Sequence, residues 1–236
     1  MLDAIRNDIV EGIVPPGSAL EVDVLATTHD VSRIPVREAL MTLVGEGLVE
    51  HQPRRGYTVT LLAEGELAEL FDVRGTLELA ALAVAVRLVR PGDVAAAREA
   101  HEKLQQAVAD GDEREYHHQS RAFHVALTRP SAMPRLLAVF DRIWDLTEPY
   151  RPMEDLAPAE AAHLHAEHAA MLAAFAAGDA EALLATASAH QENLTARVRS
   201  RRSSSPPAAA PVRRTRYRTL GGRDTGGTAS TAEEER

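Results

Sequence analysis

The sequence contains no cysteine, which excludes disulfide bonds, thiolate metal ligands and cysteine nucleophiles. Aromatic residues make up only 4% of the chain against 45% hydrophobic residues in all, so the apolar content is mostly aliphatic and favours packed helices over sheets. No stretch approaches the roughly 18 consecutive apolar residues of a membrane span. The first dozen residues carry charges throughout, unlike a signal peptide. We therefore expect a cytoplasmic protein without a membrane partner.

The chain also lacks the positive charge that is usual for a nucleic-acid-binding protein. Its formal net charge is −9, and only residues 197–236 hold more basic than acidic side chains. Bulk charge therefore gives no support for DNA binding. Any such function has to depend on where a few arginines lie in the fold.

The sequence divides into three zones, which predict a mainly α-helical protein with two domains and a tail. Residues 1–62 combine short helical stretches with a β-prone end, and residues 63–198 show helical periodicity almost throughout. Residues 199–236 have few large apolar residues and are rich in Ser, Pro, Gly and Arg. Such a segment cannot bury enough surface to offset its ordering entropy, so we expect a disordered tail.

Residues 1–62 predict a winged helix-turn-helix. A second helix is expected over 21–28, and a third begins after the N-cap Ser32 and ends near Gly47. Two β-prone runs, 48–51 and 57–60, surround a Gly-containing turn and predict a hairpin. The first helix is expected to bury the apolar stripe of Leu2, Ile5, Ile9 and Ile13.

Four arginines occupy the positions from which this fold contacts DNA. Arg33 and Arg37 lie on one side of the third helix, where a guanidinium can bridge guanine O6 and N7 or bind a phosphate. The helix N-terminus at Ser32 offers free N–H groups to a phosphate. Arg54 and Arg55 fall at the tip of the expected wing. Taken singly these arginines are ordinary surface charges; as a set on one fold they predict a DNA-binding surface.

Several blocks of residues 1–62 resemble the GntR family of bacterial regulators. These blocks are Pro15-Pro16-Gly17, the stretch from Val31 to Leu40, Gly47-Leu48-Val49 and Arg55-Gly56-Tyr57. The resemblance implies operator binding through the third helix and the wing. One departure is Ile34, where the family commonly has Thr or Ser. The DNA-contacting residues expected on these grounds are Ser32, Arg33, Pro35, Arg37, Arg54, Arg55 and Gly56.

A long helix over 63–89 opens the second zone, and its apolar stripe contains one arginine. A buried guanidinium needs an anion or several acceptors. Arg74 either pairs internally with Glu78, four residues on, or faces a cavity and receives the carboxylate of a ligand. The expected stripe consists of Leu67, Leu70, Arg74, Leu77, Ala81, Val84 and Leu88.

Histidines point to a second candidate site. His168 and His190 lie on two helices separated by Gly178, at similar distances from that turn. If the two helices form an antiparallel hairpin, these two histidines lie at the same height along it. With His124 from another helix they could bind a divalent metal such as Zn, Ni or Mn. His117 and Ser120 share the face of His124. The alternative is that histidines on charged helices lie at the surface, which we expect for His101, His118, His163 and His165.

Residues 64–198 resemble the FadR-type C-terminal domain, called the FCD domain, and the six predicted helices suggest its VanR-like variant. The motifs are Arg74-x-x-x-Glu78, Phe123-His124, Glu167-His168, Gly178-Asp179 and His190. A single winged helix makes too few contacts for tight, specific binding, so we expect a homodimer on an inverted-repeat operator. The resemblance implies a small organic acid, bound at a metal or in the surrounding pocket, that changes the spacing of the DNA-binding domains. Family members that bind the metal use an Asp or Asn as a ligand where this chain has Ser120. In this chain His117, on the same helix face, could take the place of that ligand.

These observations predict a sequence-specific transcription regulator and not an enzyme, and the family resemblance implies that its default action is repression. One alternative is a metal-dependent hydrolase built on the histidines, although the sequence has no HExxH and no nucleophile motif. Another alternative is a non-specific DNA-binding protein that uses the Arg-rich tail.

Overall fold

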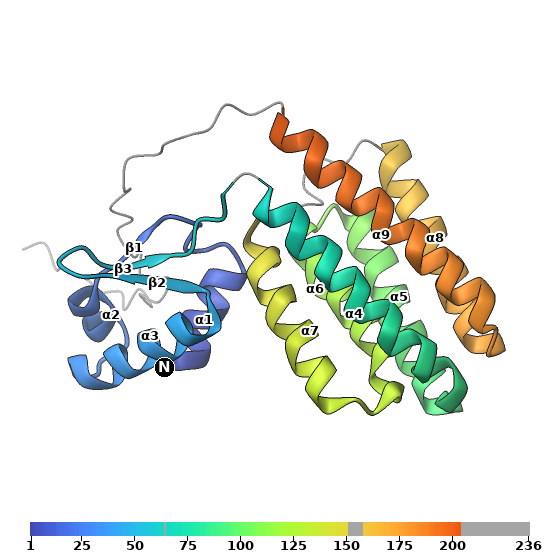
Figure 1. Ribbon diagram of the computed structural model, residues 1–236, viewed down its shortest axis with the longest axis horizontal. Coiled ribbons are helices and arrows are strands. Elements are labelled where there is room, and N and C mark those ends of the chain that lie inside the picture. The colour runs from blue at the N-terminus through green and yellow to red at the C-terminus, as the bar shows by residue number, and fades with distance from the viewer. Residues whose placement is uncertain (64, 151–157, 204–236) are drawn as a thin grey trace, which may run out of the picture.

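The computed structural model describes residues 1–63, 65–150 and 158–203, which form a small N-terminal part beside a larger helical part (Figure 1). The mainly α-helical fold class predicted from the sequence is confirmed. No helix in the described ranges is long and apolar enough to cross a membrane. The predicted tail lies outside these ranges from residue 204 onwards. Its first five residues belong to the last helix, which continues to Ser203.

The N-terminal part is a winged helix-turn-helix. The three strands form an antiparallel sheet in the order β1-β3-β2, with Val49 opposite Val59. Strand β1 is not predicted by the sequence, because two residues are too few to show an alternating pattern. The elements are α1 (Leu2–Val10), β1 (Ala19–Leu20), α2 (Val22–Thr28), α3 (Arg33–Glu46), β2 (Val49–Gln52) and β3 (Gly56–Val59).

A continuous apolar core holds these elements together. Ile5 and Ile9 of α1 are fully buried and pack with Leu40 and Leu43 of α3. The sequence prediction is wrong for Ile13, which is 50% exposed because α1 ends at Val10 and the chain leaves the core. Helix α3 ends at Gly47 in the left-handed conformation (φ 85°), which glycine adopts without steric cost.

The C-terminal part consists, within the described ranges, of six α-helices and two short 3-10 helices. Helix α4 packs between α7 and α9 on the near side of Figure 1, and α8 and α9 form the expected hairpin. The α-helices are α4 (Glu66–Leu88), α5 (Pro91–Asp110), α6 (Glu113–Thr128), α7 (Pro134–Thr147), α8 (Pro158–Ala177) and α9 (Ala180–Ser203).

The buried face of α4 differs from the predicted stripe. Leu70, Leu77 and Val84 are only half-buried, and Leu88 is 50% exposed. The helix has two neighbouring apolar stripes. The stripe that includes Gly75 packs against α9, and the second stripe, which includes Leu77 and Val84, is less buried. A Cβ at Gly75 would overlap the side chain of Gln191, so only glycine permits this approach. The residues buried on α4 are Leu67, Ala68, Phe71, Arg74, Gly75, Glu78, Ala81, Leu82, Ala85 and Val86.

The two parts meet where the C-terminal half of α7 contacts the end of α3. Arg142 donates to the carbonyl oxygens of Glu46, at 2.9 Å, and of Gly45. Leu146 packs against the N-terminal core and lies next to Gly47. Helix α7 therefore touches the N-terminal part directly.

Candidate DNA interface and buried histidine site

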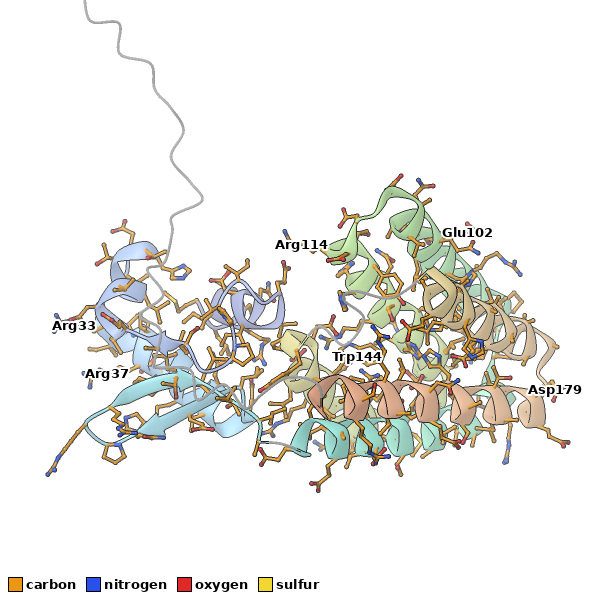
Figure 2. All side chains as sticks on the ribbon, turned by 90° about the horizontal axis from the view of Figure 1, so that it is seen from above. Arg33, Arg37, Glu102, Arg114, Trp144 and Asp179 are labelled. Atoms are coloured by element: carbon orange, nitrogen blue, oxygen red, sulfur yellow. The ribbon has the colours of Figure 1, made fainter. Side chains whose placement is uncertain are left out.

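Helix α3 presents its N-terminal turn on the exposed surface of the N-terminal part. Ser32 precedes it with extended backbone and makes no side-chain cap, and Pro35 is half-buried in the first turn. Arg33 and Arg37 are exposed and lie at the end of the molecule away from the helical part (Figure 2). Arg33 Nε contacts Asp23 Oδ1 at 2.6 Å, an exposed pair that water screens.

The wing faces the same helix. The structure brings together Arg37, Arg54, Arg55 and Gly56 around a groove of about 380 Å³, which is also lined by β1, Glu21 and the start of α2. Arg54 and Gly56 form the hairpin turn with φ of 69° and 86°, and Arg55 donates to Gln52 at 3.4 Å. Four of the seven expected DNA-contacting residues therefore line one groove. Ser32 and Arg33 line a neighbouring depression beside α2.

Three histidines from three helices converge inside the helical part. His124 of α6, His168 of α8 and His190 of α9 are all buried, and one ring nitrogen from each lies within 4.8 Å of the other two. The Nε2 atoms of His168 and His190 are 3.3 Å apart. His168 and His190 therefore lie at the same height in the α8–α9 hairpin, as inferred from their distances to Gly178.

Carboxylates fix the tautomers of two of these rings. His124 Nδ1 donates to Glu78 Oε1 at 2.5 Å, and His190 Nδ1 donates to Glu167 Oε2 at 2.7 Å. An ionised carboxylate only accepts, so the Nδ1 atoms carry the protons and the Nε2 atoms carry the lone pairs. The Nδ1 atom of His168 is buried without a hydrogen-bond partner.

Burial favours the neutral form of His168 and His190, which is the form that binds a metal. It lowers the pKa of His168 well below its usual value, and the neighbouring histidines lower it further. Burial also lowers the pKa of His190, although Glu167 opposes this shift. For Glu78, burial pushes the pKa up, but His124 and Arg74 outweigh it and the net pKa is lowered. The two imidazoles of His168 and His190 are therefore held neutral close to the ionised Glu78 and Glu167.

Arg74 lies between two aromatic rings rather than against Glu78. Its guanidinium carbon is 4.3 Å from the ring centre of Phe71 and 4.2 Å from that of Trp144, a double cation–π contact. Burial lowers its pKa to about 10 despite Glu78 and Glu148. Its Nε has no hydrogen-bond partner, and within the described ranges it forms no ion pair. Of the two alternatives for Arg74, the direct pair with Glu78 is not formed, since Glu78 bonds to His124.

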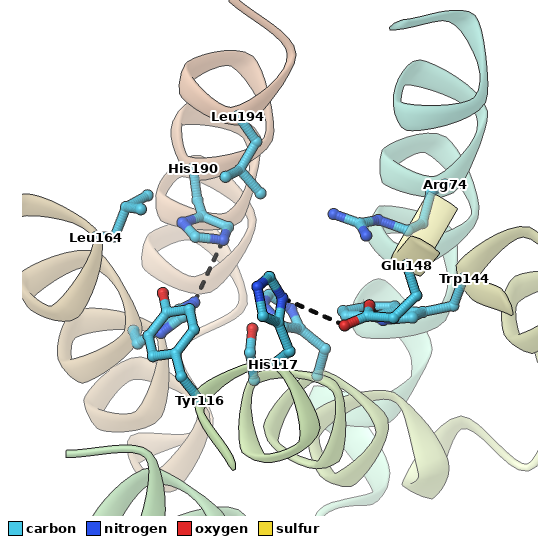
Figure 3. A pocket seen from close by; sticks show the side chains of 11 residues that line it. Arg74, Tyr116, His117, Trp144, Glu148, Leu164, His190 and Leu194 are labelled. Atoms are coloured by element: carbon cyan, nitrogen blue, oxygen red, sulfur yellow. Dashed lines mark hydrogen bonds and ion pairs between the residues drawn. The ribbon is translucent and has the colours of Figure 1, made fainter. Parts of the chain in front are cut away.

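Arg74 and the three histidines line one cavity (Figure 3). Its volume of about 20 Å³ has room for a water-sized group. On one wall His117 Nδ1 is 3.3 Å from Glu148 Oε1, and Trp144 Nε1 donates to Glu148 at 2.6 Å. The cavity is lined by Arg74, Tyr116, His117, Ser120, His124, Trp144, Glu148, Leu164, His168, His190 and Leu194.

Some residues at this site were missed or misplaced by the sequence analysis. His101 is buried against Phe123, and His165 is half-buried, so the surface prediction is wrong for both. His118 and His163 are exposed, as predicted. The position of His101, between Ala97 and Leu104 at helical spacing, is the signal that could have revealed its burial. Glu148 and Trp144 of the cavity wall carried no such signal.

A winged helix-turn-helix joined to a helical domain with a polar buried cavity defines a DNA-binding regulator with a ligand-sensing domain. Residues 2–59 match the family of bacterial regulatory proteins named gntR, and residues 69–193 match the FCD domain. The chain belongs to the GntR family, in its FCD-containing branch. It is a transcription regulator and not an enzyme, and neither the hydrolase nor the non-specific DNA-binding alternative has support in these matches.

Related proteins agree with this assignment. The HTH-type transcriptional regulator McbR of Escherichia coli K12 is 33% identical over 179 residues, which cover 75% of this chain and 81% of McbR. Its structure superimposes with a TM-score of 0.77 at 29% identity, over 86% of this chain and 96% of that chain. The E. coli repressor GlaR is 32% identical over 62% of this chain and 69% of its own. A GntR-type regulator from Rhodococcus sp. RHA1 has a TM-score of 0.71 at 25% identity, covering 84% and 94%.

Proposed function

We propose that this regulator represses transcription by binding an inverted-repeat operator as a homodimer, and that a small carboxylate at the buried histidine site modulates that binding. In this proposal residues 1–62 bind DNA and residues 63–198 dimerise and bind the effector. The observation that carries it is one cavity that joins three buried imidazoles to an arginine that forms no ion pair within the described ranges. The VanR-like variant and the disordered tail stay predictions.

The donor set favours a divalent metal at His124, His168 and His190. Two nitrogens bound at about 2.05 Å to a tetrahedral Zn²⁺ stand about 3.3 Å apart, which is the separation of the His168 and His190 Nε2 atoms. Carboxylates on the outer nitrogens of His124 and His190 match the arrangement that orients metal-bound imidazoles. A bound ion would supply a Lewis-acidic centre with positions open to an oxygen ligand. Ser120 and His117 line the same cavity as further candidate ligands.

Arg74 supports an acid as the effector. Its guanidinium has desolvated faces between two rings, and its Nε still lacks a hydrogen-bond acceptor. A ligand carboxylate would supply that acceptor and a compensating charge. The small cavity implies that Trp144 of α7 and Glu148, which directly follows α7, move when such a ligand enters.

The second apolar stripe of α4 supports the homodimer. Val73 and Leu88 are 39% and 50% exposed, and Leu77 and Val84 between them are half-buried. Their spacing places them along one face of the helix, beside the face that packs in the protein's own core. A second copy meeting this face would bury it. A dimer also supplies the two-fold symmetry that an inverted repeat requires.

Helix α7 gives a route from the cavity to DNA. Trp144 and Glu148, at its end, line the cavity, while Arg142 and Leu146 contact the end of α3. A second link passes through Asp145, which contacts Arg121 of α6 at 2.5 Å and Arg6 of α1 at 3.7 Å. A shift of α7 on ligand binding would therefore reorient the DNA-binding part.

Native mass spectrometry of the full chain, purified without chelators or a metal column, tests this proposal. We expect a dimer that holds one divalent ion per chain, restored by Zn²⁺ if it is lost. His168→Ala should remain a dimer without the ion, whereas His118→Ala, which changes an exposed histidine of α6, should bind it normally. A monomer would contradict the dimer. A wild type that holds no ion after Zn²⁺, Ni²⁺ or Mn²⁺ is added would contradict the metal site.

A further inference from the structure

Ile34, the second residue of α3, is more exposed than any other large apolar side chain in the described ranges. Its exposed fraction is 68%, against 52% for Met41 and 54% for Leu61. It is not part of the apolar core of the N-terminal part. The residue therefore gains nothing from packing within its own chain.

Helix formation does not account for an isoleucine at this position either. A β-branched side chain loses rotamer freedom in a helix and is a weaker helix former than Ala, Leu, Arg or Lys. An exposed apolar side chain also orders water around it, which a polar residue would avoid. We therefore expect Ile34 to make its apolar contact with another molecule, in a complex.

The surroundings of Ile34 fit DNA. It lies in the first turn of α3, and Arg37 follows three residues later on the same side of the helix. Arg37 in turn lines the groove shared with Arg54 and Arg55 of the wing. An apolar protein partner would have to cover these charges, whereas DNA phosphates neutralise them. Arg37 beside one exposed aliphatic group, with Arg54 and Arg55 lining the same groove as Arg37, therefore favours a nucleic-acid surface that itself offers one apolar spot.

Thymine provides that spot, because its 5-methyl group is the apolar feature of the major groove. Residues in the N-terminal turn of a recognition helix reach the base edges. We propose that Ile34 contacts a thymine methyl group in each operator half-site, next to the base or phosphate bound by Arg37, and so sets sequence preference there. This inference rests on the proposed binding of an inverted-repeat operator through α3.

Removal of single methyl groups from the operator tests the contact. The operator is first selected from random duplexes with the full-length wild type, and each symmetric pair of thymines is then replaced by deoxyuridine. Affinities are measured by fluorescence anisotropy at one fixed salt concentration. Burial of one methyl group changes a binding constant about fourfold, so we expect one thymine pair whose replacement, which removes two methyl groups, weakens wild-type binding about 10- to 20-fold.

Two variants test whether the thymine methyl group is contacted by Ile34 itself. Ile34→Ala should bind the selected operator about tenfold more weakly and should be insensitive to deoxyuridine at that same pair. Met41→Ala changes an exposed apolar residue two turns further along α3, and it should keep the wild-type response. Both changed positions are exposed, so both variants should melt at the wild-type temperature.

The outcomes separate this inference from the proposal on which it rests. The inference is wrong if wild type and Ile34→Ala respond alike to every replacement, or if no thymine methyl affects wild-type binding. An unchanged operator affinity of Ile34→Ala would instead assign the residue to a contact with another protein. If the wild type selects no two-fold symmetric site, the operator proposal fails, and the contact fails with it.

Discussion

Arg142 Nε, on α7, donates a hydrogen bond across 2.9 Å to the carbonyl oxygen of Glu46, the last residue of α3. The last carbonyls of a helix have no partner within the helix, and a cation at that end is favoured by the helix dipole. Because Trp144 of the same helix α7 lines the histidine cavity, this bond joins the candidate sensor to the helix that we propose contacts DNA. The relationship motivates the central claim that the state of the cavity sets operator affinity.

Arg37→Ala should weaken operator binding and flatten sequence discrimination. A bidentate arginine–guanine contact is worth about 1–3 kcal/mol, a factor of about 5 to 150 in affinity for each half-site. Arg87→Ala removes an exposed arginine from α4, far from the wing, and serves as the matched control. Fluorescence anisotropy on the selected operator and on a scrambled duplex measures both properties. Equal losses for the two variants would show that Arg37 does not contact bases.

Gly75→Ala should destabilise the helical part by about 1–3 kcal/mol, because the added methyl group would overlap Gln191 where α4 crosses α9. Gly45→Ala, within α3, meets no atom within 4 Å and should be neutral or stabilising by up to about 1 kcal/mol. Urea unfolding gives both values. A Gly75→Ala protein as stable as the wild type would contradict the close packing of these two helices.

His101 should make stability depend on pH. Burial lowers the pKa of this ring, with Arg98 adding to the shift and Glu102 opposing it. The unfolded chain therefore takes up its proton first, and the free energy of unfolding falls as pH decreases from about 6.5 through the lowered pKa. His101→Gln should lose less stability than the wild type between pH 7 and pH 5, measured by urea unfolding in EDTA. Identical losses would contradict a neutral buried His101.

The DNA-binding half was largely predictable because its signals are local. A proline, an N-cap serine, a terminal glycine and a Gly-containing turn each act within a few residues, so α3 and the hairpin follow from Ser32, Gly47 and Gly56. Strand β1 escaped prediction, because its two residues, Ala19 and Leu20, are ordered by pairing with β3 rather than by their own pattern.

The helical half was predicted less completely because its key relationships join distant parts of the chain. The turn at Gly178 allowed His168 and His190 to be placed level, but no sequence rule could show Glu78 bonded to His124 in place of Arg74. On α4 two apolar stripes compete, and only packing against α9 decides which one is buried.

The central claim is tested most directly by operator affinity measured with the cavity loaded and empty. Full-length protein is stripped with EDTA, and anisotropy titrations on the selected operator follow without metal, with Zn²⁺, and with Zn²⁺ plus acetate, succinate or citrate. Arg142→Ala breaks the contact between α7 and α3, and Arg135→Ala, an exposed arginine of the same helix, is its control.

We expect loading to change the affinity of wild type and Arg135→Ala at least fivefold, a typical allosteric coupling, and that of Arg142→Ala by less than twofold. Calorimetry should show that all three proteins still bind Zn²⁺. Wild-type affinity that is the same in every condition, although the metal is bound, would contradict the account.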